Sequence, residues 1–207
     1  MASYTKLAKN NWQVVISLGY DANCWSKEEV DFFLNKIKDS NIFNPVFIDL
    51  FTGLRIAELC GLRWCDLDID KSLLTINNQA VYSTQNKELQ LMSTLKTSSS
   101  HRTIVIPEVL ANYLRKIKEE KNPLPEDFIV TNMDGLMENP HCLSMRFKRA
   151  VKKFEKSLEA KKKEDSTIDE QNYMQLNQIT FHGLRHTHVL NKMRTNSAKI
   201  LDDIFSN

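Results

Sequence analysis

The sequence has no long apolar run, which excludes a helix that spans a membrane. Its 207 residues are 42% hydrophobic and 26% charged, a balance typical of a globular chain. Apolar stretches such as Val46 to Leu50 are interrupted by charge, far short of the roughly 18 residues that a bilayer span needs. The first residues also lack the apolar core of a secretory signal. We therefore expect a cytoplasmic protein without membrane contact.

Cysteine is scarce too, and repeats and low-complexity tracts are lacking. Four cysteines without a Cys-x-x-Cys pair are too few for a disulfide framework. We expect reduced core thiols at Cys24, Cys60, Cys65 and Cys142. A chain of this length has room for one main domain. Residues 1–24 show no strong periodicity and are expected to be a linker or the remnant of an upstream domain, which leaves residues 25–207 as the domain proper.

Positive charge is not in large excess, but it is concentrated in one segment. The formal net charge of the chain is only +2. Residues 146–163 hold nine lysines or arginines against two glutamates, a local net charge of +7. A basic helix of this kind can bind phosphates, or it can be a solvated helix face that runs into a charged linker. Charge alone leaves both alternatives open.

Apolar spacing and capping residues predict two helices early in the domain. Ser26 and Glu29 form a capping box ahead of a run with apolar residues at helical spacing. Asn44 as N-cap and Pro45 in the first turn predict a second helix that halts near Gly53. Both helices present apolar faces and are expected in the core.

The remaining pattern predicts a small sheet between helices. A short third helix should carry Arg55 just inside its start. Between Leu73 and Pro107, alternation and β-branching predict three antiparallel strands, at residues 73–83, 89–97 and 101–107. Lys96 should lie at a strand end, beside a turn at residues 97–100. The later expected elements are a helix from Pro107 to Pro123, a strand from Phe128 to Thr131, a basic helix from Asn139 to about Leu158 and a final helix from Phe181. The fold class is therefore α+β, mainly helical, with a small three-stranded antiparallel sheet.

Two short boxes and the hairpin between them carry the chemistry. The boxes are TGLRIAEL at residues 52–59, followed by GLRW and Asp66, and HGLRHT at residues 182–187; the hairpin ends in LKTSSSHRTIVIP. Taken singly, Arg55, Lys96 and the later histidine and arginine have a structural explanation as exposed polar residues. In this order and spacing they resemble the arginine box, the lysine hairpin and the His-x-x-Arg box of tyrosine-type site-specific DNA recombinases of the phage-integrase family. The resemblance covers roughly residues 25 to 190.

The resemblance implies a catalytic domain that breaks and rejoins DNA. Arg55 and Arg185 would clamp the nonbridging oxygens of a phosphodiester under attack, because guanidinium donors are planar, bidentate and permanently charged. Lys96 would protonate the leaving deoxyribose oxygen. His182 would assist proton transfer or hydrogen-bond a phosphate oxygen, and Glu58 would orient its neighbours. In this family a tyrosine forms a reversible three-prime phosphotyrosyl link, with no metal or nucleotide cofactor.

The resemblance also implies the partners. They are double-stranded DNA and other recombinase protomers, since the family forms tetramers on DNA. Histidines at 182, 186 and 188 raise the alternative of a zinc site, but the glutamate that follows the first histidine in metalloproteases is missing, so we expect no metal. Further basic residues are candidate contacts that position DNA without reading its sequence: Arg102, Lys148, Arg149, Lys152 and Lys153.

Two parts of the family pattern have no counterpart in the sequence. Residues 1–24 are too short for the helical DNA-binding domain that precedes the catalytic domain in the family. All five tyrosines precede His182, and residues 196–207 do not resemble the family's Leu-Gly-His segment. We therefore expect a truncated catalytic domain without its nucleophile. The alternatives are a noncatalytic DNA-binding or dimerisation module with the same fold, and a recombinase whose nucleophile comes from another chain.

Overall fold

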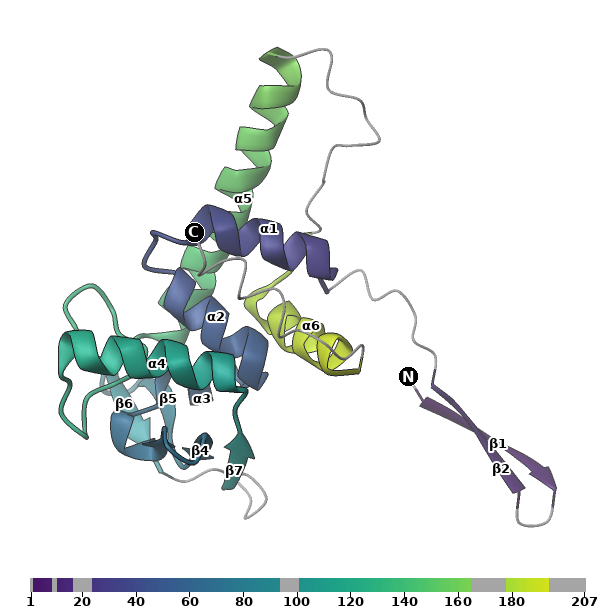
Figure 1. Cartoon of the computed structure of the whole chain (residues 1–207), viewed down its shortest axis with the longest axis horizontal. Coiled ribbons are helices and arrows are strands. Elements are labelled where there is room, and N and C mark those ends of the chain that lie inside the picture. The colour runs from purple at the N-terminus through teal and green to yellow at the C-terminus, as the bar shows by residue number, and fades with distance from the viewer. Residues whose placement is uncertain (1, 9–10, 17–23, 94–100, 165–177, 194–207) are drawn as a thin grey trace.

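Helices and small antiparallel sheets follow one another along the chain, which confirms the predicted α+β class. The computed structural model describes residues 2–8, 11–16, 24–93, 101–164 and 178–193 (Figure 1). Side chains are described for residues 24–93, 101–155 and 178–188. Within the described ranges, none of the helices combines the length and the apolar character needed to cross a membrane.

The first helix of the domain, α1 (Lys27–Ile37), begins where the capping box predicts it. The Ser26 side chain accepts a hydrogen bond from the Glu29 amide at 3.2 Å, and the Glu29 carboxylate accepts one from the Ser26 amide at 2.8 Å. Two backbone donors that the helix itself cannot satisfy are thus paired at its N-terminus. The apolar face of α1, with Phe33 at its centre, is buried.

The second helix, α2 (Phe43–Thr52), begins earlier than predicted. Its N-cap is Ile42, and no side chain caps it. Asn44 lies inside the first turn, where its side-chain amide donates instead to the carbonyl oxygen of Ile129 at 3.1 Å. The predicted end is confirmed, because Gly53 caps the helix with φ of 59°, a left-handed conformation that glycine adopts without strain.

The third helix, α3 (Ile56–Cys60), places Arg55 one residue before its start rather than just inside it. Arg55 is the N-cap, with extended backbone angles of φ −72° and ψ 143°. The reason lies three residues on, where the Glu58 carboxylate accepts the Arg55 amide hydrogen at 3.0 Å. A short 3-10 turn, Trp64–Asp66, follows α3.

A three-stranded antiparallel sheet lies beneath α3 and α4 in Figure 1, with strand order β3-β4-β7. Its strands are β3 (Leu67–Asp68), β4 (Leu73–Ile76) and β7 (Arg102–Val105). Ile76 at the end of β4 pairs with Arg102 at the start of β7. This register brings the first residue of β7 to the edge of the sheet near the turn into β5.

The strand membership differs from the prediction. The segment from 73 to 83, expected to form one strand, is divided between β4 and β5 (Gln79–Ser83), and β5 pairs with β6 (Glu88–Met92) in a separate hairpin. The break falls where the Asn77 side chain donates to the Asp66 carboxylate at 3.3 Å. The chain therefore leaves one sheet and enters another instead of continuing as a single strand.

The helix α4 (Glu108–Lys121) confirms the predicted helix from Pro107 to Pro123. The strand expected at residues 128–131 does not form. Phe128 and Thr131 make only isolated β-bridges, to Arg63 and Met137. This stretch is therefore a loop with local pairing.

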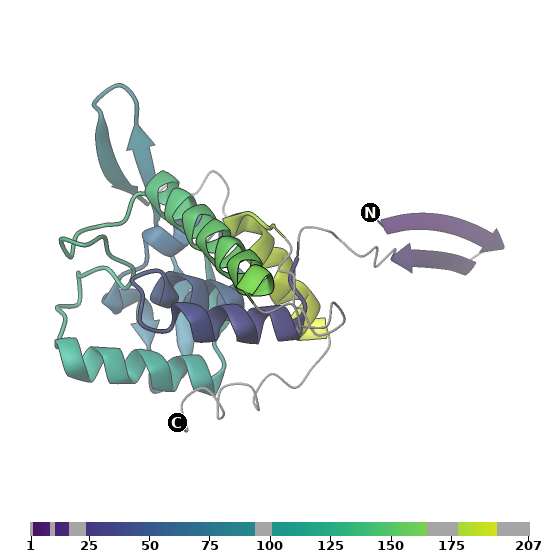
Figure 2. The same cartoon turned by 90° about the horizontal axis from the view of Figure 1, so that it is seen from above.

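The last two helices are α5 (Pro140–Glu164) and α6 (Phe181–Met193). The helix α5 extends beyond the predicted end near Leu158. Aromatic rings join both helices to α1, because Phe147 of α5 lies 5.8 Å from Phe33 and 5.3 Å from Phe181 between ring centroids. The helices α1, α5 and α6 lie next to one another in both views (Figures 1 and 2).

The N-terminal residues form a two-stranded antiparallel hairpin that the sequence analysis did not anticipate. Its strands are β1 (Ala2–Ala8) and β2 (Asn11–Ile16). The hairpin projects away from the helices in both views (Figures 1 and 2). Its assignment to a linker or to the remnant of an upstream domain stays a prediction.

The four cysteines all lie among the described residues and form no disulfide bond, but they are not all in the core. Cys60 is buried, and burial raises the pKa of its thiol. Cys24 is half-buried, while Cys65 in the 3-10 turn and Cys142 in the first turn of α5 are exposed. The prediction of core thiols was therefore wrong for the last two, which lie on the solvent side of their elements.

Candidate active site

The turn between α2 and α3 fixes the position of Arg55. Gly53 has a positive φ, and a Cβ atom on it would lie 2.7 Å from Cδ2 of the His188 ring. Leu54 is buried behind the turn. With its backbone held on both sides, Arg55 extends its side chain outward, and 62% of it is exposed.

Glu58 joins two arginines from different parts of the chain. Its side chain is almost completely buried, and its Oε1 accepts hydrogen bonds from Nη1 of Arg55 at 2.9 Å and Nη1 of Arg102 at 3.1 Å. Its Oε2 accepts from Nη2 of Arg102 at 2.7 Å, and also from the Arg55 amide. The bidentate pair links β7 to α3, and such pairs are both strong and geometrically specific.

The electrostatics of this cluster favour ionised Glu58. Burial alone would raise the pKa of the carboxyl, but the hydrogen bonds from Arg102 and from the backbone and side chain of Arg55 outweigh burial and lower the pKa to about 2. Two arginines facing one carboxylate leave the cluster with a net positive charge. A negatively charged ligand is therefore favoured at the exposed end of Arg55.

The helix α6 is held against α2 and the start of α1. Nδ1 of His188 lies 2.8 Å from the carbonyl oxygen of Leu50. The Trp25 amide donates to the hydroxyl of buried Thr187 at 3.0 Å, and that hydroxyl donates to the carbonyl oxygen of Gly183. These contacts fix the face of α6 that carries Arg185.

A buried carboxyl, Asp49 on α2, lies within electrostatic range of both Arg185 and Glu58. Asp49 is fully buried, and burial raises its pKa well above the ordinary value. The charge of Arg185 and a weaker contribution from the Leu54 amide lower the pKa, and the charge of Glu58 raises it. Arg185 and Glu58 therefore both lie close enough to Asp49 for their charges to act on it.

The Asp49 carboxylate and the Arg185 guanidinium both have buried atoms without a hydrogen bond of normal geometry among the described residues. Both carboxylate oxygens of Asp49 are buried without a partner of normal geometry, and so is Nη1 of half-buried Arg185. Asp49 was not among the residues predicted for the site. The available signal was a charged residue within the apolar segment FNPVFIDLFT of α2.

Three further predicted site residues are His182, Arg102 and Lys96. His182 is exposed on α6, and its ring lies 4.9 Å from that of His186, at right angles. Arg102, predicted to contact DNA, directs its terminal nitrogens to Glu58. Lys96 lies outside the described residues, between the end of β6 and the start of β7.

The sequence matches the model of a known family. The model of the phage integrase family matches residues 26–200. This range includes both arginines and the segment of Lys96.

The chain belongs to the phage integrase family.

Known members extend the comparison. The integrase of Staphylococcus phage L54a is 29% identical over 175 residues, 77% of this chain and 43% of the relative. The transposase from transposon Tn916 of Enterococcus faecalis is 29% identical over 159 residues, 73% of this chain and 35% of the relative. The structure of the Tn1549 transposon integrase in complex with transposon right end DNA has a TM-score of 0.66 at 22% identity, and the match covers 90% of this chain and 59% of that chain. This chain shares its fold with the Tn1549 integrase. It spans less than two thirds of the length of each of these three proteins.

The basic helix of this integrase-family chain is amphipathic. The predicted phosphate contacts are exposed on α5: Lys148, Arg149, Lys152 and Lys153. Phe147 and Val151 on the opposite face are buried. Arg146, counted with the basic segment, is instead paired with buried Glu138. The exposed positive charge therefore forms one face of α5.

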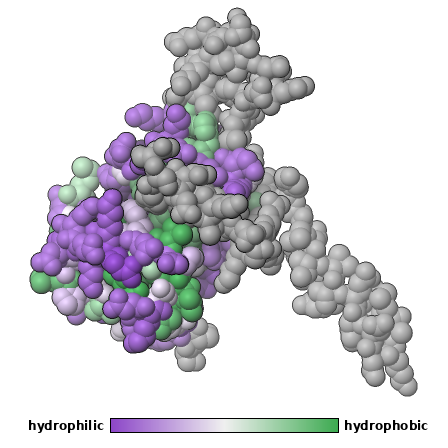
Figure 3. All heavy atoms as spheres, in the orientation of Figure 1, coloured by the Kyte–Doolittle hydropathy of each residue, from purple (hydrophilic) through white to green (hydrophobic). Residues whose placement is uncertain are grey.

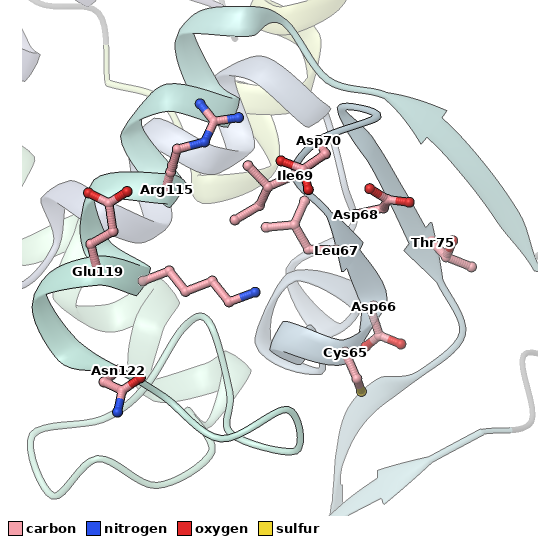
Figure 4. Close-up of a pocket in the computed structure, with 11 residues that line it drawn as sticks. Cys65, Asp66, Leu67, Asp68, Ile69, Asp70, Thr75, Arg115, Glu119 and Asn122 are labelled. Carbon is pink, nitrogen blue, oxygen red and sulfur yellow. The ribbon is translucent and has the colours of Figure 1, made fainter.

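A second face of the molecule is also polar but of mixed charge. Hydrophilic side chains cover α4 in Figure 3. A pocket of about 730 Å³ lies between α4 and the segment of the 3-10 turn and β3, and it is lined by side chains of both signs, including Asp68, Asp70, Arg115 and Glu119 (Figure 4). None of the arginines of the candidate site lines it. Among the described residues, no group of three or more histidine, cysteine or acidic side chains is arranged to hold a metal ion.

Proposed function

We propose that this chain is the catalytic domain of a site-specific DNA recombinase, which binds double-stranded DNA and activates a scissile phosphate. The proposal is supported by two observations: Arg55, at the start of α3, is paired with buried Glu58, and the charges of Glu58 and of Arg185, on α6, both act on buried Asp49. Two guanidinium groups from distant parts of the sequence suit the nonbridging oxygens of one phosphate. DNA as the ligand is supported by the Tn1549 integrase complex.

In this proposal the exposed side chains contact the phosphate, and the buried ones hold them in position. The exposed guanidinium of Arg55 has one nitrogen on Glu58 and presents the others to a phosphate oxygen. Arg185 supplies the second positive charge. Glu58 and Arg102 hold Arg55 in place, while exposed His182 assists proton transfer or binds a phosphate oxygen. Lys96 is proposed as the general acid for the leaving deoxyribose oxygen.

We propose that none of the tyrosines of this sequence is the nucleophile. All five of them precede His182. Tyr113 packs against Phe43 and Phe47 in the core, and burial raises its pKa to about 12. Tyr82 lies on the β5–β6 hairpin. Strand exchange would then require the larger assembly of recombinase protomers that the family forms.

DNA binding by wild-type protein and by three arginine variants tests the proposal. Arg55→Gln and Arg185→Gln are expected to weaken binding of a short duplex by about tenfold each, because a charged hydrogen bond contributes about 1.5–3 kcal/mol. Arg115→Gln is the matched control, since Arg115 lies on α4 and its side chain donates to Asn112 and not to Glu58. Fluorescence anisotropy at fixed salt measures the affinities. Equal affinity in all four proteins would reject the proposed site and favour the noncatalytic DNA-binding module.

A further inference from the structure

A fully buried acid in the core of a DNA-binding domain is unexpected. Asp49 lies on α2 between residues that are themselves buried and apolar, including Phe47, Ile48 and Leu50. Its side chain is fully buried, and among the described residues neither oxygen makes a hydrogen bond of normal geometry. An ionised carboxylate in such a place is strongly unfavourable. A leucine would pack there without this cost, so the carboxyl itself requires an explanation.

The helix that packs on α2 provides a counterpart. Nη1 of Arg185 on α6 is also buried without a hydrogen-bond partner among the described residues. The contact between His188 and the Leu50 carbonyl, one turn further along α6 and next to Asp49, fixes the packing of these helices. The two packed helices α2 and α6 thus each carry one unsatisfied group: an acceptor, the Asp49 carboxylate, on α2, and a charged donor, the Arg185 guanidinium, on α6.

We propose that Asp49 is a positioning residue that controls, from behind the site, how far the Arg185 guanidinium is available to an anion. The inference rests on the proposed function, in which Arg185 binds a phosphate. A neutral Asp49 carboxyl leaves the guanidinium to the ligand. An ionised Asp49 carboxylate competes for it, because a carboxylate and a phosphate present the same kind of paired oxygen acceptors to an arginine.

The charge of Asp49 depends on a small set of neighbours. From α6 these are Arg185, whose charge lowers the pKa of Asp49, and His188, whose Nδ1 lies on the Leu50 carbonyl. From α3 they are Glu58, which stays ionised and raises the pKa of Asp49, and the Cys60 thiol, which burial keeps neutral. Burial has the largest effect and raises the pKa of Asp49. The proton is therefore retained to a higher pH than in an exposed aspartate.

Linkage gives the direction of the effect. An anion bound to Arg185 offsets the positive charge that favours ionised Asp49, so binding raises the pKa of Asp49 further. By reciprocity, loss of the Asp49 proton weakens anion binding. Affinity should therefore fall as the pH rises through the pKa of Asp49, by a factor on the order of five or more.

Binding of a short duplex between pH 4.5 and pH 9 at constant ionic strength tests the inference. Asp49→Asn keeps the shape of the side chain and removes the titration, and Asp134→Asn in an exposed turn is the matched control. Affinity is expected to decline with rising pH in wild type and in Asp134→Asn, and Asp49→Asn is expected to lose most of this decline. His182 and His186 are present in all three proteins, so any effect that they have on binding cancels in the comparison. Identical pH profiles for the Asp49→Asn variant and wild type would overturn the inference.

A second readout separates failure of the inference from failure of the proposed function. Carbon-13 NMR of the carboxyl groups follows the titration of Asp49 without DNA, and it also reports whether each variant is folded. Arg185→Gln is expected to raise the pKa of Asp49, because it removes the charge that lowers it. An unchanged Asp49 titration in Arg185→Gln would reject the positioning role. A shifted titration together with DNA binding that ignores Arg185 would reject only the proposed function.

Discussion

At the scale of single residues, Glu58 is the group on which the candidate site most depends. It is buried, accepts hydrogen bonds from Arg55 and Arg102, and has a pKa lowered to about 2. A carboxyl with a lowered pKa stabilises the fold fully above the pKa of about 4.5 that it has when unfolded. This contribution, about 3 kcal/mol at most, is lost as the pH falls from there toward 2.

Replacement of Glu58 by glutamine should therefore destabilise the protein in a pH-dependent way. Glu58→Gln is expected to lower the free energy of unfolding by about 2–3 kcal/mol at pH 7, because two arginines lose their anionic partner. The difference from wild type should shrink between pH 4.5 and pH 2. Urea unfolding at several pH values measures it, and Asp68→Asn at an exposed pair with Lys71 is the control. A pH-independent difference would contradict the account.

Gly53 gives a second prediction at this scale, because it has two reasons to be glycine. Gly53→Ala is expected to destabilise by about 2–3 kcal/mol, since its φ is 59° and the added Cβ would lie 2.7 Å from the His188 ring. Gly135→Ala is a matched control: its φ is 78°, but a Cβ there meets nothing within 4 Å. Thermal unfolding should show the smaller loss for the control. Equal losses would mean that the contact with α6 contributes nothing.

At the scale of elements, the sequence predicts what is local and misses what is not. The capping box at Ser26 and the left-handed end at Gly53 depend on neighbouring residues, so α1 and the end of α2 were predictable. The division of strands at Asn77 and the pairing of β7 with β4 depend on contacts across the sheet. Asp49 was missed for the same reason, since its importance appears only when α6 packs against α2.

The basic face of α5 gives the prediction at this scale. Glutamine at Lys148 and Lys152 together is expected to weaken DNA binding and to reduce the slope of log affinity against log salt by about 0.9 for each lost phosphate contact. Glutamine at Lys116 and Lys121, exposed on α4, is the control. Anisotropy titrations over a series of salt concentrations give the slopes. Equal slopes for both double variants would mean that α5 is a solvated helix face and not a DNA contact.

At the scale of the whole molecule, the chain is expected to bind DNA without forming a covalent intermediate. Positioned attack can contribute on the order of 7–11 kcal/mol to catalysis, and no tyrosine follows the His-x-x-Arg box in this sequence. Incubation with nicked duplex that traps three-prime phosphotyrosyl adducts should yield none. A full-length family integrase run in parallel should yield them. An adduct mapped to any of the five tyrosines would contradict this expectation.

The central claim is that Arg55 and Arg185 act on one phosphate, and a double-mutant cycle tests it most directly. Duplex affinity is measured for wild type, Arg55→Gln, Arg185→Gln and the double variant at one salt concentration. Residues that share a ligand group are coupled, whereas independent sites are additive within about 0.3–0.5 kcal/mol. The account predicts that the double variant binds more tightly than the sum of the single losses implies, by about 1 kcal/mol or more. Strict additivity would show that the two arginines bind separate groups and would contradict the proposed active site.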